Sequence, residues 1–362
     1  MTQLDFFQVS RAEAASEILF KKEWPRTTAS TTVAAMSDST DLTTLSIKEL
    51  KELIRSSGLS FEDCIDKADL RSRAAEAQER LEASAPKGGG GGGGGGGGSS
   101  AAGGMARASK TFGGYDALVI GPPSVLDGSE AAELAVIVLH GLGATKEDFA
   151  DLPRMLGGEQ ALAGRRLVYV LPQAPPSPLL GAAWWQINVA AFLAISTASP
   201  DSMAKMIREE PVGLSQCREK LQKLCAEVRA FAGGGSALPS RRLLLAGFSQ
   251  GAMTAMDTAL HMPPTEPPAG VVFLSGAPIV VEQWSARLQA LKQAGEALPV
   301  LVTHGMADGT LPFACSGWVR DLLTANGADV KYVTHPGGHD LGGASVVRSL
   351  VSFVAARLAD RA

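Results

Sequence analysis

Beyond residue 110 the chain alternates between short, continuous apolar runs and longer segments in which apolar residues recur every three or four positions. Continuous apolar runs are typical of strands buried on both faces, whereas the longer period is typical of helices. The expected strands are Ala117–Ile120, Leu134–Leu139, Leu167–Leu171, Leu243–Gly247, Val271–Leu274, Val300–Thr303 and Val330–Val333. The expected helices are Lys146–Leu156, Leu214–Phe231, Gln250–Leu260, Phe313–Asn326 and Ala344–Leu358. This alternation predicts an α/β fold with a mostly parallel, doubly wound sheet covered by helices on both faces.

An uninterrupted glycine run from Gly88 to Gly98 divides the chain into two parts. Glycine-rich segments behave as flexible coils, so the run predicts a linker, which we assign to residues 88–110. Residues 111–362 then form the large α/β domain, and residues 38–87 form a small, all-α module. We expect residues 1–37 to be disordered.

Two helical patterns precede the linker. Ser46 and Glu49 form a capping box, Gly58 ends the first helix, and a second helix is expected from about Lys67 to Leu81. The pattern resembles SAP-like helix-extended-helix modules, some of which bind DNA. However, the eight basic and eleven acidic residues between Asp38 and Lys87 give a net charge of −3, which is the wrong sign for contacting a phosphate backbone. We therefore expect a module that docks a protein partner or is purely structural, and no nucleic-acid partner.

Composition and charge describe an ordinary globular chain, with 45% hydrophobic residues, 19% charged residues and a net charge of −4. No apolar segment is long enough for a transmembrane helix, and the first twenty residues lack the pattern of a secretory signal. Four scattered cysteines favour reduced thiols, and hence the cytoplasm. The Thr-, Ser- and base-rich stretch Lys21–Ala35 leaves import into an organelle as an alternative.

The segment Gly247-Phe248-Ser249-Gln250-Gly251 places a serine between two glycines, after an apolar run and before a helical pattern. This is the G-x-S-x-G pattern of a nucleophile elbow, a tight turn between strand and helix that exposes the serine hydroxyl. In a glycine-rich chain the pentapeptide alone could arise by chance. Its position between a predicted strand and a predicted helix favours Ser249 as a nucleophile over a buried turn serine.

A serine nucleophile needs a base and a group that orients the base, in the chain order Ser, Asp or Glu, His for this type of sheet. His339 follows the last predicted strand and is the candidate base, with the nearby His335 as the alternative. Asp308 follows the strand before it and is the candidate acid. His304 is expected to brace the Asp308 loop.

The oxyanion formed in acyl transfer needs two backbone N–H donors. We expect these from Gln250, which follows the nucleophile, and from Leu142, in the loop after an early strand. Gly141-Leu142-Gly143 lacks the third glycine of a dinucleotide-binding fingerprint, and the sequence has neither a P-loop nor a clustered set of metal ligands. We therefore expect no cofactor and no metal.

Taken together, these motifs resemble the phospholipase/carboxylesterase family of α/β-hydrolases, which includes the acyl-protein thioesterases. The segments that carry the resemblance are His140–Gly143, Leu171–Pro175, Gly247–Gly251, Leu274–Gly276, His304-Gly305 with Asp308, and Gly337–His339. The resemblance covers about Ala117 to Leu358 and implies a cofactor-free carboxylesterase or thioesterase (EC 3.1) acting on acyl esters or thioesters. It matches Ser249, Asp308 and His339 to the catalytic triad, and Leu142 and Gln250 to the oxyanion donors.

The sequence departs from the thioesterases at Trp184-Trp185-Gln186, where they usually carry a carboxylate in place of the glutamine. This step and the apolar stretch after it resemble a less characterised esterase branch of the family. Trp184, Trp185 and Phe192 lie in a long apolar connection, which often forms a lid or binding wall, and we expect them to bind a medium-length acyl chain. The alternative function is a catalytically idle hydrolase fold that acts as a protein-binding module.

Overall fold

The computed structural model describes residues 50, 53–54, 57, 59, 67–83, 104–177, 180–187 and 205–360. The chain divides into two compact units, and the described residues of the larger unit begin at Gly104. Residues 1–37, the glycine run of the linker, Ser46, Glu49, Gly58 and Phe192 all lie outside the described residues, and so do the predictions made for them.

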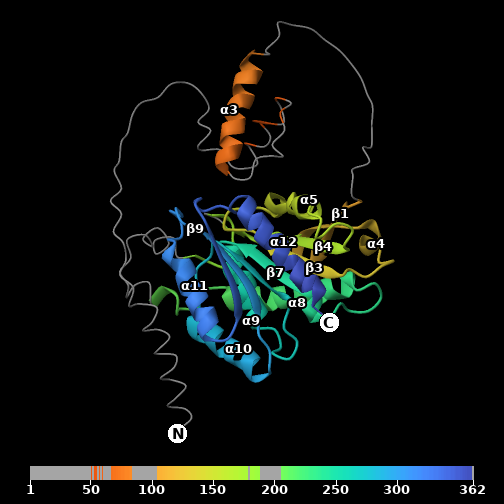
Figure 1. Cartoon of the computed structure of the whole chain (residues 1–362), viewed down its shortest axis with the longest axis vertical. Coiled ribbons are helices and arrows are strands. Elements are labelled where there is room, and N and C mark those ends of the chain that lie inside the picture. Colours follow the sequence, from red (N-terminus) through yellow and green to blue (C-terminus); the bar gives the residue numbers. More distant parts are fainter. Residues whose placement is uncertain are drawn as a thin grey trace. The chain divides into compact units, whose positions relative to one another are not determined.

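The larger unit is organised around an eight-stranded sheet with the order β1-β2-β4-β3-β7-β8-β9-β10 (Figure 1). The strands are β1 (Ala106–Phe112), β2 (Tyr115–Gly121), β3 (Leu134–Leu139), β4 (Leu167–Pro172), β7 (Leu243–Phe248), β8 (Gly270–Leu274), β9 (Pro299–Gly305) and β10 (Asp329–His335). The six strands from β4 to β10 run parallel, whereas β1 and β2 pair antiparallel at one edge. A separate two-stranded ribbon joins β5 (Pro176–Ser177) to β6 (Gly181–Ala182).

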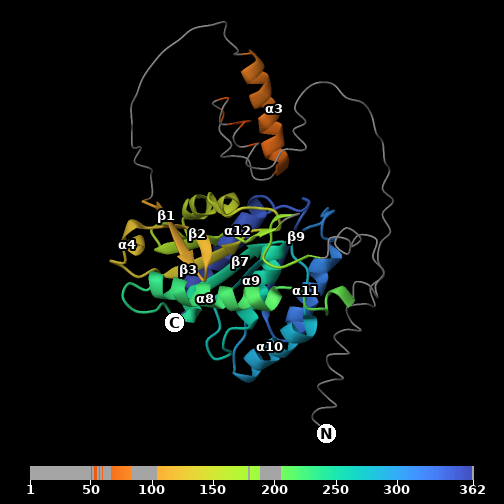
Figure 2. The ribbon, with the colours of Figure 1, turned by 180° about the vertical axis from the view of Figure 1, so that it is seen from behind.

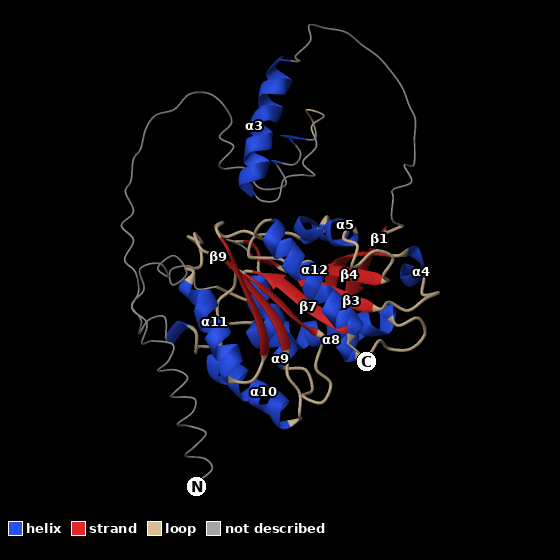
Figure 3. Cartoon of the chain, in the orientation of Figure 1, coloured by secondary structure: helices blue, strands red, loops and turns tan. Residues whose placement is uncertain are grey.

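Helices cover both faces of the sheet, as the colouring by secondary structure shows (Figure 3). On one face lie α5 (Leu152–Gly157) and α12 (Ala344–Ala359), which are in front in Figure 1. The opposite face carries α8 (Leu214–Ala232), α9 (Gln250–Leu260), α10 (Val281–Gln293) and α11 (Ala314–Ala325), several of which are in front in Figure 2. Short helical segments are α4 (Pro123–Leu126), η1 (Lys146–Phe149) and η2 (Ser240–Arg242).

The central strands are buried on both faces because alternate side chains enter two separate cores. Leu245 and Val271 pack in the core beneath α8 to α11, whereas their strand neighbours Leu244 and Val272 pack in the core beneath α5 and α12. This arrangement explains why the strands are continuous apolar runs. The predicted mostly parallel, doubly wound sheet is confirmed, and each of the seven predicted strands is present.

Two predictions for the larger unit need correction, and one helix was missed. Residues 106–110, assigned to the linker, belong to edge strand β1, whose exposed and half-buried residues alternate and whose polar composition hid the strand. The helix expected over Lys146–Leu156 is interrupted into η1 and α5, with Pro153 at the start of α5. Helix α10 was not predicted, although its buried Trp284, Leu288 and Leu291 have helical spacing.

The smaller unit contains helix α3 (Lys67–Ala83), which confirms the second helix predicted there. Leu70, Ala74 and Ala77 lie on one face of α3 and pack in a small apolar cluster with Leu50 and Ile54. Leu50 and Ile54 belong to the segment in which the first helix was expected.

Candidate active site

The G-x-S-x-G segment forms a strained turn between β7 and α9. Ser249 has φ 55° and ψ −121°, a conformation that a residue with a side chain rarely adopts. A Cβ atom at Gly247 would overlap the carbonyl of Gly251, and one at Gly251 would overlap the carbonyl of Leu139. Neither position therefore has room for a side chain, and the turn has the form predicted for a nucleophile elbow.

Ser249, His339 and Asp308 form a continuous chain of hydrogen-bonding contacts. The Nε2 atom of His339 lies 2.9 Å from Oγ of Ser249, and its Nδ1 atom lies 2.7 Å from Oδ2 of Asp308. The serine follows β7, the aspartate follows β9 and the histidine follows β10. The carboxyl ends of these parallel strands meet at one edge of the sheet, which is why residues far apart in sequence come together.

The Asp308 carboxylate is fully buried and surrounded by donors. Backbone N–H groups of Thr310 and Leu311 donate to Oδ1 at 2.9 and 2.8 Å, and Nε2 of His304 lies 3.2 Å from Oδ2. Burial alone would raise the pKa of Asp308. The hydrogen bonds from His304 and His339 outweigh burial and hold the pKa well below its ordinary range. The acid is therefore ionised at neutral pH, as the orienting group of a triad must be.

The loops that carry Asp308 and His339 are joined through their backbones. The N–H of Met306 donates to the carbonyl of His335 at 2.8 Å, and the N–H of Ala307 donates to that of Gly337 at 3.0 Å. A Cβ atom at Gly305 would overlap the carbonyls of this second loop, so the approach needs a glycine there. These bonds fix the separation between acid and base.

The Asp340 side chain shapes the turn around His339. Its two carboxylate oxygens accept hydrogen bonds from the N–H groups of Gly338, at 2.8 Å, and Gly342, at 2.7 Å. This role of Asp340 was not predicted from the sequence. The signal was an aspartate among glycines, a composition typical of side-chain-stabilised turns.

The expected oxyanion donors lie beside the serine. Within the described residues, the backbone N–H groups of Leu142 and Gln250 have no hydrogen-bond acceptor. Gly141 packs against the elbow, since a Cβ atom there would lie 3.4 Å from Cβ of Ser249. Two unpaired N–H donors at a helix start and a neighbouring loop are what a developing oxyanion requires.

His140 anchors the loop that carries Leu142. Its Nε2 atom accepts a hydrogen bond from the N–H of Ala174 at 3.0 Å, so its Nδ1 atom holds the proton and donates to the carbonyl of Gly141 at 2.8 Å. Burial lowers the pKa of His140, which keeps this imidazole neutral. The carbonyl of His140 in turn accepts from Nε1 of Trp184 at 2.8 Å.

Trp184 and Trp185, predicted to bind substrate, are buried against the start of α9. The side chain of Gln250 accepts from the N–H of Trp184 at 3.1 Å and donates to the carbonyl of Trp185 at 2.9 Å. Nε1 of Trp185 donates to Oγ1 of Thr254 at 3.0 Å. The Trp185 ring and the backbones of both tryptophans therefore brace the start of α9, whereas the Trp184 ring packs against Tyr115 and His140. Only the three-dimensional structure reveals this role of the Gln250 side chain.

The remaining histidines, His261, His304 and His335, lie against other groups than Ser249. Nε2 of His304 also lies 2.9 Å from the carbonyl of Leu311, so this residue braces the Asp308 loop as expected. His261 follows the last residue of α9, and its Nδ1 atom lies 2.8 Å from the carbonyl of Asp257. His335, the alternative base, is buried with its Nδ1 atom 3.6 Å from Oδ1 of Asp340. The structure therefore brings His339, rather than His335, to Ser249.

Several known proteins are similar to this chain. Acyl-protein thioesterase 1 of Neurospora crassa is 26% identical over 219 residues, which cover 60% of this chain and 84% of the relative. Acyl-protein thioesterase 1 of Mycosarcoma maydis is 28% identical over 236 residues, which cover 60% of this chain and 88% of the relative. The crystal structure of Zea mays acyl-protein thioesterase 2 is 19% identical, with a TM-score of 0.49, and the match covers 67% of this chain and 98% of that one.

The sequence profile of one family, described as phospholipase/carboxylesterase, matches residues 121–356. The matched region contains the elbow, the Asp308 loop and the His339 loop, and it spans well over half of the chain. In the structure, the matched region runs from the end of β2 through most of α12. The predicted α/β-hydrolase fold and the predicted family are therefore both confirmed. The chain belongs to the phospholipase/carboxylesterase family.

Proposed function

We propose that this protein is a serine hydrolase that cleaves carboxylic esters or thioesters of acyl chains through an acyl-enzyme on Ser249. The observation that carries the proposal is the contact chain from Ser249 through His339 to Asp308 on a strained elbow. The names of two fungal relatives, both acyl-protein thioesterases, support an acyl substrate.

In the first half of the reaction, Oγ of Ser249 attacks the acyl carbonyl carbon and its proton passes to Nε2 of His339. Asp308 holds the imidazole in the tautomer with the proton on Nδ1 and stabilises the imidazolium that forms. The N–H groups of Leu142 and Gln250 bind the oxyanion. When the tetrahedral intermediate collapses, the bond to the leaving oxygen or sulfur breaks, and His339 gives its proton to the leaving group.

In the second half, water attacks the acyl-enzyme and transfers a proton to His339. Collapse of this second intermediate releases the carboxylic acid, and the proton returns to Oγ of Ser249. The cycle leaves the protein unchanged and consumes one molecule of water for each ester or thioester cleaved. We propose that Trp184, Trp185 and Phe192 contribute to the wall for a medium-length acyl chain, the first two by fixing the connection against α9.

We also propose a cytoplasmic location and a protein partner for the smaller unit. Three described cysteines, Cys217, Cys225 and Cys315, are buried free thiols, as is usual in a reducing compartment. Within the described residues, no helix is long and apolar enough to cross a membrane. The net negative charge between Asp38 and Lys87 favours a protein over a nucleic acid as partner.

The test of the catalytic proposal is the turnover of a short p-nitrophenyl ester by Ser249→Ala. We expect a loss of several orders of magnitude in kcat, because removing the nucleophile leaves only binding and oxyanion stabilisation. Ser349→Ala is the matched control, since Ser349 lies on the exposed side of α12 and bonds only the carbonyl of Ser345. Turnover by Ser249→Ala at the rate of this control would refute the proposal.

A further inference from the structure

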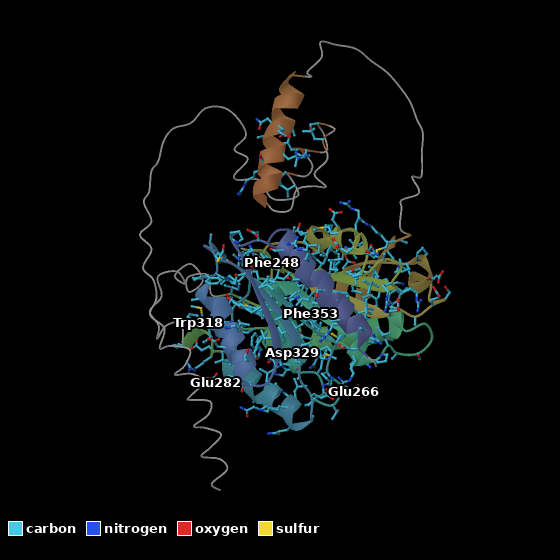
Figure 4. All side chains as sticks on the ribbon, viewed as in Figure 1. Phe248, Glu266, Glu282, Trp318, Asp329 and Phe353 are labelled. Atoms are coloured by element: carbon cyan, nitrogen blue, oxygen red, sulfur yellow. The ribbon has the colours of Figure 1, made fainter. Side chains whose placement is uncertain are left out.

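Phe248, the residue before the nucleophile, lies beside the proposed base. It is the last residue of β7 and is half-buried. Its place in the larger unit is labelled in Figure 4. The centre of its ring lies 4.8 Å from the centre of the His339 ring, with the two planes inclined by 49°. The contact joins the strand that precedes the serine directly to the loop that carries the base.

The same ring also contacts the oxyanion loop. A Cβ atom at Gly141 would lie 3.2 Å from Cδ1 of Phe248, so the ring rests against the backbone that leads to Leu142. Elsewhere Phe248 packs with the apolar core beneath α5 and α12, which holds it in place. The ring therefore lies between two parts of the site that must keep their positions relative to Ser249.

The charge on His339 changes during the reaction, since the imidazole becomes an imidazolium when it takes the serine proton. An aromatic ring within about 6 Å of a cation attracts it, which favours the charged form. The other titratable groups near this imidazole are Asp308, which contacts Nδ1, and His304, which lies behind Asp308. On the loop of His339 itself, the Asp340 carboxylate accepts hydrogen bonds from two backbone N–H groups, and His335 packs near Asp340.

We infer that Phe248 is a positioning residue for catalysis, which holds the His339 ring toward Ser249 and stabilises its imidazolium form. The inference rests on the proposed serine-hydrolase function. It assigns a role in the chemistry to a position that the G-x-S-x-G pattern leaves open.

The test compares Phe248→Leu, which removes the aromatic ring, with Phe248→Tyr, which keeps it. Phe231→Leu is the matched control: Phe231 makes a similar tilted contact with Phe112, at 5.6 Å and 50°, but lies on α8 away from the triad. The readout is the pH profile of kcat/KM for a short p-nitrophenyl ester, together with kcat and KM at the optimum.

For Phe248→Leu we expect kcat to fall about two- to five-fold with little change in KM, because the imidazolium of the transition state loses its aromatic neighbour. At the same time the acid limb of the profile should move to lower pH by about 0.4 to 0.7 units, because the protonated base of the free enzyme loses the same stabilisation. Phe248→Tyr and Phe231→Leu should keep the position of the wild-type limb.

A purely structural role would lower activity without moving the acid limb, so an unmoved or upward-shifted limb in Phe248→Leu overturns the inference. If that variant does not fold, Phe248→Met, which has a similar volume and no ring, is measured in its place and must show the same shift. Ser249→Ala is run in parallel. If it stays active, the hydrolase proposal fails, whereas an inactive Ser249→Ala with an unmoved limb refutes only the role of Phe248.

Discussion

The Nε2 atom of His339 lies 2.9 Å from Oγ of Ser249, although 90 residues of sequence separate them. Four neighbouring parallel strands, β7 to β10, account for the proximity, because the loops after β7, β9 and β10 emerge at the same edge. The site is thus built by sheet topology, and the local turns only aim the side chains.

Replacing Asp308 by Asn should lower kcat by up to about 10⁴-fold, because the amide cannot hold the imidazole in the required tautomer. The change should also weaken the fold in a pH-dependent way. Since the folded-state pKa of Asp308 is depressed, its carboxylate stabilises the protein above the pKa in the unfolded chain, about 3.9, and this stabilisation is lost as pH falls through the folded pKa.

Urea unfolding of wild type and Asp308→Asn between pH 7 and pH 3 measures this difference in the free energy of unfolding. We expect the wild type to be more stable at pH 7 and the difference to shrink below about pH 4. A difference that grows on acidification would contradict the assigned charge state of Asp308.

The elbow glycine Gly251 should not tolerate a methyl group. In Gly251→Ala the new Cβ would overlap the backbone carbonyl of Leu139. Because neither atom belongs to a flexible side chain, the overlap can be removed only if the helix shifts. We expect a loss of about 3 kcal/mol in the free energy of unfolding, measured by denaturant titration. The control is Gly317→Ala in α11, where the new Cβ would lie more than 4 Å from every described atom outside its own stretch of helix and the change should be neutral or stabilising. Equal stability of the two variants would refute the steric account.

The boundary of the larger unit should lie before β1. A shortened protein that begins at Gly103 keeps all seven residue pairs between β1 and β2, and we expect it to fold and hydrolyse esters with unchanged rate constants. One that begins at Gly113 loses β1, uncovers the edge of β2 and should unfold at lower denaturant or aggregate. The measurements are the denaturant midpoint of unfolding and kcat/KM of the two shortened proteins. Loss of activity in the longer protein would mean that the first 102 residues contribute to the site.

Substrate preference should follow acyl chain length. If the apolar connection that includes Trp184 and Trp185 forms a groove, each buried methylene adds up to about 0.8 kcal/mol of binding. We therefore expect kcat/KM to climb with chain length until the groove is filled, in a panel of esters and thioesters from about two to sixteen carbons. A flat or falling series beyond acetyl would instead indicate a small-ester hydrolase.

Much of this architecture was predictable because its signals are local. The central strands are continuous apolar runs, and Ser249, Asp308 and His339 each stand within four residues of the end of a strand. Strand β1 was not recognised because an edge strand needs only one apolar face, and its lysine, arginine and threonine resemble the polar end of a linker. Local signals identify an element only when the element carries its own apolar pattern.

The contacts of the site that were missed depend on tertiary structure. Nothing in the sequence near Gln250 shows that its amide joins Trp184 to Trp185, or that the ring of Phe248 reaches His339. The same holds for the backbone bonds between the Met306 and His335 loops, which form only when β9 and β10 pair. Such contacts connect residues that share no motif.

Labelling with a fluorophosphonate probe tests directly whether Ser249 is an activated nucleophile. Only a serine whose hydroxyl is deprotonated by a neighbouring base reacts with such a probe at a useful rate. We predict that the folded wild-type protein carries a single adduct, which peptide mapping places on Ser249, and that Ser249→Ala carries none. A folded wild-type protein that does not label, or an adduct that persists in Ser249→Ala, would contradict the account.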